Sequence, residues 1–118
     1  MKIAIPLDVN KTDVCPAFAR TPYFMVYDKE QDKTDILKNP AANECGGAGG
    51  KAAQFMIDSG ITTVITPRCG ENAAMVLKAA EIKIYRTNSM DASYNIKEYL
   101  DGKLEPLTRF HAGFQGKA

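Results

Sequence analysis

The sequence predicts one α/β domain in which a β-hairpin precedes alternating helices and strands. Short apolar segments rich in β-branched residues recur along the chain, and segments with helical spacing separate the later ones. The chain has 118 residues, 45% of them hydrophobic, and can bury about two-thirds of its unfolded surface without disulfides or a structural metal. We expect a single domain over residues 1–118, with its core in 1–107 and an irregular tail in 108–118.

The first half of the chain is expected to supply three strands. Residues 2–7 are apolar and β-branched, which predicts a buried strand at the start. Residues 23–28 predict a second strand and residues 34–37 a weaker third. The charged stretch 29–33 lies between them and is typical of a hairpin turn.

The second half predicts helices that alternate with strands. A glycine-rich stretch, residues 45–50, opens a helix that ends at Ser59-Gly60. Nearly every residue of 61–66 is β-branched, which predicts a strand that Pro67 ends. The remaining expected elements are a helix over 71–80, a strand over 82–86 and a helix over 91–100, the last with Ala92, Ile96, Tyr99 and Leu100 facing inward.

Charge and cysteine content exclude several classes of protein. The 15 Lys and Arg against 14 Asp and Glu give a net charge of +1, so the chain lacks the broad basic surface that nucleic acid or an anionic membrane requires. Its apolar runs are far shorter than the roughly 20 residues of a membrane span, and its N-terminus lacks the order of a signal peptide. Three widely spaced cysteines do not form a disulfide framework. We therefore expect a cytoplasmic protein with free thiols.

Candidate ligand-binding residues follow the strands. In open α/β sheets, ligands bind beyond the carboxyl ends of the strands, where the loops with Arg20 and Arg68 are expected. The glycine-rich turn opens onto a helix N-terminus, which is a preformed anion site. Its backbone can approach a ligand closely at four positions, Gly46, Gly47, Gly49 and Gly50. The alternative is a flexible loop that only caps the helix.

Two cysteines and a histidine suggest a soft metal site. Cys69 lies just before a helix and beside Arg68, and both the helix dipole and the guanidinium favour a thiolate, which soft metals prefer. Cys15 and the only histidine, His111, would complete an open site, although no paired spacing fixes its geometry. Each of the three residues could instead lack a function, and Cys45 has no assigned role.

Several motifs occur in a fixed order, namely Met1-Lys2-Ile3-Ala4-Ile5-Pro6, Phe18-Ala19-Arg20, Gly46-Gly47-Ala48-Gly49, Cys69-Gly70-Glu71-Asn72 and Asp101-Gly102-Lys103-Leu104. With them, residues 1–107 resemble the dinitrogenase iron-molybdenum cofactor biosynthesis family. The resemblance implies a ribonuclease H-like, three-layer α/β/α fold, with a five-stranded mixed sheet of order 3-2-1-4-5 whose second strand is antiparallel. That order would make strands one and four neighbours and place Cys15 opposite Cys69.

The resemblance also implies a function in handling an anionic metal-sulfur cluster, iron-sulfur or molybdenum-containing, or its precursor. We expect a carrier, not an enzyme, that passes the cluster to a biosynthesis or acceptor protein. Many members have histidine where this chain has Ala17, and Cys15 would substitute for it. The expected metal ligands are Cys15, Cys69 and His111, and the expected cluster-binding residues are Arg20, Gly46, Gly47, Gly49, Gly50, Arg68 and Gly70.

Two other functions stay open on the sequence alone. A metal-free regulatory domain could bind a small anion or a phosphorylated ligand through the glycine-rich turn. A nuclease is suggested only by analogy of fold, and it would use Asp8 at the end of the first strand. The sequence specifies no oligomeric state.

Overall fold

The structure is a computed structural model that describes residues 1–112, so residues 113–118 of the expected tail lie outside it. The elements of the described range follow the predicted order. They are β1 (Lys2–Leu7), β2 (Tyr23–Asp28), β3 (Lys33–Lys38), α1 (Ala48–Asp58), β4 (Thr63–Ile65), α2 (Glu71–Ala79), β5 (Lys83–Tyr85) and α3 (Ala92–Leu100).

The strands form a mixed sheet of order β3-β2-β1-β4-β5, which confirms the predicted topology. β2 is antiparallel to both of its neighbours, whereas β4 is parallel to β1 and to β5. The pairing of β1 with β4 places Ile3 opposite Thr63 and Ala4 opposite Val64. The loops that follow β1, β3 and β4 therefore all leave the same edge of the sheet.

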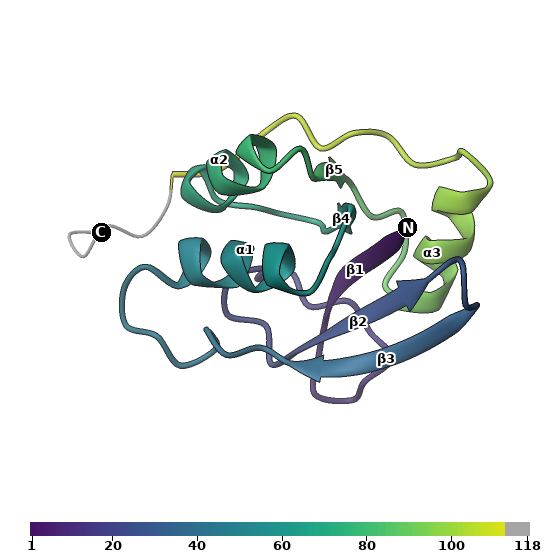
Figure 1. Cartoon of the computed structure of the whole chain (residues 1–118), viewed down its shortest axis with the longest axis horizontal. Coiled ribbons are helices and arrows are strands. Elements are labelled where there is room, and N and C mark those ends of the chain that lie inside the picture. The colour runs from purple at the N-terminus through teal and green to yellow at the C-terminus, as the bar shows by residue number, and fades with distance from the viewer. Residues whose placement is uncertain (113–118) are drawn as a thin grey trace.

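Helices cover both faces of the sheet, which confirms the three-layer α/β/α architecture (Figure 1). Successive residues of a strand point to opposite faces, so each strand contributes to two cores. Ala4 and Val64 pack in the cluster that contains α1 and α2, while Ile3, Ile5 and Ile65 pack in the cluster beneath α3. The near-continuous apolar sequence of β1 is thus explained by burial on both sides.

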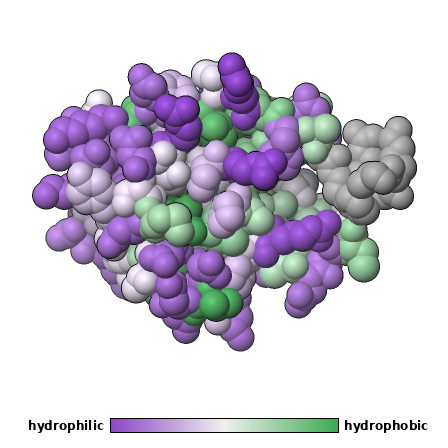
Figure 2. Space-filling model, turned by 180° about the vertical axis from the view of Figure 1, so that it is seen from behind, coloured by the Kyte–Doolittle hydropathy of each residue, from purple (hydrophilic) through white to green (hydrophobic). Residues whose placement is uncertain are grey.

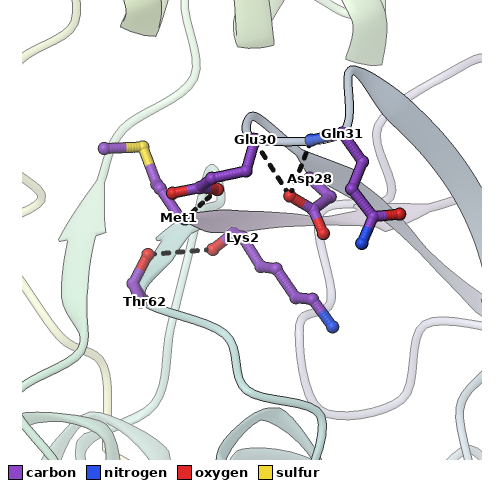
Figure 3. Close-up of polar contacts among 6 residues, drawn as sticks. All are labelled: Met1, Lys2, Asp28, Glu30, Gln31 and Thr62. Carbon is purple, nitrogen blue, oxygen red and sulfur yellow. Dashed lines mark hydrogen bonds and ion pairs between the residues drawn. The ribbon is translucent and has the colours of Figure 1, made fainter.

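Polar contacts fix the start of β1 between its two neighbours (Figure 3). The amino group of Met1 contacts the carboxylate of Glu30 in the hairpin turn. The Thr62 hydroxyl donates to the Lys2 carbonyl across 3.1 Å. Asp28 closes the hairpin by accepting backbone N–H groups of the turn, the first at 3.0 Å. These contacts hold the end of the sheet opposite the edge with the candidate loops.

The α3 face differs from its prediction at two residues. Leu100, expected to face inward, is 40% exposed, while Asn95 is fully buried. The Asn95 side chain accepts the N–H of Asn88 at 2.8 Å and donates to the carbonyls of Ser89 and Asp91. A buried amide is stable when it is fully hydrogen-bonded, and here it ties α3 to the loop after β5.

The surface is mainly hydrophilic on the side opposite to the view of Figure 1. There, hydrophobic residues show as small patches separated by hydrophilic ones (Figure 2). Among residues 1–112, no helix combines the length and apolar character needed to cross a bilayer.

The first turns of α1 and α2 approach each other closely at Gly49. A Cβ atom placed on Gly49 would lie 3.4 Å from the Cβ of Ala73 and 3.5 Å from its backbone nitrogen. A side chain larger than a methyl group would collide there. The small residue at this position therefore sets the distance between the two helix N-termini.

Gly49→Val should lower the free energy of unfolding by about 1–3 kcal/mol relative to Gly50→Val, because only the first adds branches against Ala73. Both substitutions replace a helical glycine by the same residue, and a Cβ at Gly50 has nothing within 4 Å. Urea unfolding of the two variants measures the difference. Equal stabilities would contradict the close approach of the helices.

Candidate functional site

A pocket of about 430 Å³ lies at the sheet edge where the loops after β1, β3 and β4 meet. Its wall comes from residues 16–20, 47–50, 68–70 and 72–73, and from His111. These segments are far apart in the sequence. The parallel pairing of β1 with β4 and the start of both helices at this edge bring them together.

The glycine-rich loop is tied to the loop after β1 by Arg20. The guanidinium of Arg20 donates to the backbone carbonyls of Glu44 and Cys45, the second at 3.3 Å. Gly47 then begins α1 with φ +71°, a left-handed conformation that glycine adopts without strain. Lys51 pairs with the Glu44 carboxylate at 3.4 Å, and Glu44 does not line the pocket.

Two helix N-termini converge on the pocket. Gly47 is the N-cap of α1 and Gly70 the N-cap of α2, and within residues 1–112 neither helix has a side-chain capping hydrogen bond. The first backbone N–H groups of a helix have no partner inside it and carry the positive end of the helix dipole. Ala48, Gly49 and Asn72 from these first turns line the pocket. The arrangement provides positive potential without a buried ionic side chain.

The C-terminal segment brings His111 to the pocket. After α3 the chain returns beside β5, where the Leu107 N–H donates to the Ile84 carbonyl at 3.0 Å. Farther along, the His111 N–H donates to the Cys69 carbonyl at 3.3 Å, and the His111 carbonyl accepts the Glu71 N–H at 2.9 Å. The tail is therefore paired with the loop after β4, as its path in Figure 1 shows.

Apart from the side chains of Arg20, Arg68, Asn72 and His111, the wall of the pocket is mainly apolar. Phe18 is buried at its back and packs edge-on against Phe24, with 5.4 Å between the ring centroids. Small side chains form the sides. Neither Asp nor Glu occurs among the described residues that line the pocket, which consist of Pro16, Ala17, Phe18, Ala19, Arg20, Gly47, Ala48, Gly49, Gly50, Arg68, Cys69, Gly70, Asn72, Ala73 and His111.

The pocket brings together most of the residues that the sequence singled out, and two of them lie elsewhere. Gly46 is exposed and outside the wall, and Cys15 is also outside it, with its Sγ atom 3.9 Å from the Ala17 carbonyl. Placed in the wall are Arg20, Gly47, Gly49, Gly50, Arg68, Cys69, Gly70 and His111.

The prediction of a Cys69 thiolate is wrong. Cys69 is only 1% exposed, and burial raises the pKa of its thiol to about 11, against a smaller opposing effect of Lys78. Its Sγ atom lies 3.6 Å from the Gly70 carbonyl, an acceptor that suits the protonated thiol. The helix dipole and Arg68 would favour the anion only if the sulfur were solvated. Cys69 is a neutral part of the pocket wall at physiological pH.

The three expected metal ligands do not assemble into a metal site in this structure. Among residues 1–112, no group of three or more His, Cys, Asp or Glu is placed to hold a metal ion. Cys15 lies outside the pocket, Cys69 is buried, and the exposed His111 ring has its Nδ1 atom 3.2 Å from the Ala112 carbonyl. Asp8, the residue of the nuclease alternative, accepts the Val9 N–H at 2.7 Å and does not line the pocket.

Among the wall residues that were not chosen as site residues from the sequence, Phe18 supplies an aromatic ring and Asn72 an amide. Phe18 lies between alanines in the loop after β1, and Asn72 lies in the first turn of α2. Asn72 could have been found from its place just after the N-cap Gly70, where a side chain lies near the helix N-terminus. The position of Phe18 depends on tertiary packing, and no local pattern indicates it.

Cys69 should resist alkylation in the folded protein. With iodoacetamide at about pH 8, Cys45 is exposed and should react first, whereas Cys69 should react only after unfolding because its thiol is buried and protonated. Peptide mapping by mass spectrometry, with and without urea, measures the order. Modification of Cys69 as fast as that of Cys45 in the native protein would contradict this assignment.

Comparison with known proteins agrees with the fold and places the chain in a family. A Thermotoga protein named as a candidate NifB protein is 34% identical, with a TM-score of 0.77 and coverage of 92% of this chain and 95% of that one. The apo orange protein of Desulfovibrio gigas is 25% identical, with a TM-score of 0.83 and coverage of 97% and 96%. An uncharacterized protein of Methanocaldococcus jannaschii is 33% identical over 89% of this chain and 90% of its own length. The family model described as dinitrogenase iron-molybdenum cofactor matches residues 1–102, and the chain belongs to this family, which is related to iron-molybdenum cofactor biosynthesis.

Proposed function

We propose that the protein is a carrier for an anionic metal-sulfur cluster or its precursor, held non-covalently in the pocket at the sheet edge. The family relates the chain to iron-molybdenum cofactor biosynthesis, and the carrier role is our more specific proposal. A carrier must bind its cargo tightly enough to protect it and release it to an acceptor protein. Non-covalent binding meets both needs, since no metal-ligand bond has to break on release.

One observation carries the proposal: the pocket, whose described lining residues include no carboxylate, has its positive charge concentrated at two helix N-termini and two arginines. Arg20 and Arg68 lie in the wall, and both helices begin there. Charge-assisted hydrogen bonds from guanidinium and backbone N–H groups are the strong ones in proteins. These groups favour an anion over a cation or a neutral ligand.

The apolar wall favours sulfur over oxygen as the outer atom of that anion. Phosphate and other oxyanions hold their water strongly, and burying an oxygen against carbon without a hydrogen bond is costly. Sulfur is a weak hydrogen-bond acceptor and is polarisable, so it loses less when it contacts Phe18, Ala48 or Ala73. A sulfide-rich anion therefore fits both the charge and the wall.

Binding of a metal-free oxyanion such as phosphate is the second candidate function. It rests on the same helix N-termini, which are common phosphate sites. The two candidates differ in the ligand atom that the wall contacts. A pair of ligands that differ only in that atom separates them.

Tetrathiomolybdate should bind at least about tenfold more tightly than molybdate, because the two dianions differ only in sulfur against oxygen. Arg68→Gln should weaken tetrathiomolybdate binding by about tenfold through loss of a charge-assisted hydrogen bond. Lys97→Gln on α3 is the matched control for loss of one positive charge and should bind like the wild type. Anaerobic absorption titrations measure all three. Tighter binding of molybdate or phosphate would favour the second candidate.

Cys69→Ala should bind tetrathiomolybdate within about threefold of the wild-type affinity. In the proposed binding mode, the buried Cys69 side chain is part of the pocket wall and does not bond to the metal. The same anaerobic titration reports the affinity, and circular dichroism checks that the variant is folded. Loss of binding in a folded variant would show that the sulfur ligates the metal, and the non-covalent mode would be wrong.

A further inference from the structure

A second hollow, of about 410 Å³, adjoins the cargo pocket. It lies between the loop after β4, the end of β5 and the returning C-terminal segment. Arg68 and His111 line both hollows, so the two lie side by side. We call this second hollow the arginine groove, because Arg68, Arg86 and Arg109 line it and the described lining residues include no Asp or Glu.

The distribution of cationic residues is uneven. The chain has four arginines, and every one of them lines the pocket or the arginine groove. It has eleven lysines, and none of the ten within residues 1–112 lines either hollow. Arginine presents a planar fork of donors that pairs bidentately with carboxylate or phosphate, whereas lysine offers a hydrated point charge. In the arginine groove, this preference indicates recognition of carboxylates and not a general positive field, since the whole chain carries only +1.

The arginine groove is held in shape by backbone pairing. Arg86 donates its N–H to the Glu105 carbonyl at 2.9 Å, and His111 is bonded to the loop after β4. Between these points Phe110 lies under the Lys78 ammonium, 4.2 Å from the ring centroid. The segment that carries Arg109 is therefore fixed at both ends. The backbone of the groove is therefore set before a partner binds, which confines the entropy loss on binding to the side chains.

The guanidinium groups are available for a partner. Within residues 1–112, Arg86 is the only one of the three with a carboxylate partner, Glu105 at 3.6 Å. Both side chains of that pair are more than half exposed, and such surface pairs contribute little and exchange readily. One carboxylate on one exposed arginine would bind weakly for the same reason. Useful affinity needs several carboxylates that span the groove together.

We infer that the arginine groove docks an acidic segment, rich in Asp and Glu, of the protein that supplies or receives the cargo. The inference rests on the proposed carrier function, because the groove opens beside the cargo pocket through Arg68 and His111. A partner that is bound there would hold its own metal-binding groups at the pocket mouth. Electrostatic complementarity of this kind sets partner choice and speeds association.

The test uses a fluorescein-labelled twelve-residue peptide of alternating Glu and Gly, with a Gln and Gly peptide as the neutral probe. The acidic peptide should bind the wild type in low salt, and Arg86→Gln with Arg109→Gln should weaken it at least about tenfold. Lys29→Gln with Lys97→Gln removes the same charge elsewhere and should change the affinity less than about threefold. Fluorescence anisotropy measures each affinity.

A charge-conserving pair, Arg86→Lys with Arg109→Lys, should bind the peptide more weakly than the wild type because it loses the planar fork. Three results would each overturn the inference. The lysine pair could bind the peptide as tightly as the wild type does, or the lysine-to-glutamine control could weaken peptide binding as much as the arginine-to-glutamine pair. A twelve-nucleotide single-stranded DNA could also bind the wild type more tightly than the acidic peptide does. The Arg86→Gln, Arg109→Gln variant should still bind tetrathiomolybdate like the wild type. If the peptide fails to bind while tetrathiomolybdate binds, the docking site is rejected and the carrier function stands. If tetrathiomolybdate fails to bind the wild type, the carrier function is rejected, and with it the identity of the docking partner.

Discussion

The site depends on the close approach of the first turns of α1 and α2. Gly49 lets the helices meet at Ala73, and this contact places two positive helix ends side by side at one pocket. Arg20 and Arg68 add to the positive charge in the same wall. Like partial charges that the fold holds together repel one another, and an anion between them relieves the repulsion. The packing of the protein thus creates the affinity that the proposed cargo uses.

Much of the fold could be predicted from local patterns, because strands and helices here agree with their propensities and α1 is followed by Gly60, with positive φ, where the helix was expected to end. The inward face of α3 could not be fully predicted. Apolar spacing assigned Leu100 to the core, but the buried amide of Asn95 depends on a loop that folds beside it. Such a residue is recognised only when its hydrogen-bond partners are known.

The candidate site was predictable in its place but not in its chemistry. The topology predicts that the site lies at this sheet edge, beside the glycine-rich turn and Arg68. Whether Cys69 is a thiolate depends on its burial, which is set by the tail and by packing around the helix N-termini. His111 comes to the pocket by pairing with the loop after β4, a contact that no spacing in the sequence indicates. Whether the expected residues could bind a metal therefore depended on tertiary contacts.

The most direct test of the account is an anaerobic ¹H–¹⁵N correlation titration of the protein with tetrathiomolybdate. The account predicts that the largest amide shifts occur in the first turns of α1 and α2, at Gly49, Gly50, Asn72 and Ala73. It also predicts small shifts at Cys15, which lies outside the pocket wall. Shifts that centre on Cys15 and leave the two helix N-termini unchanged would contradict the central claim.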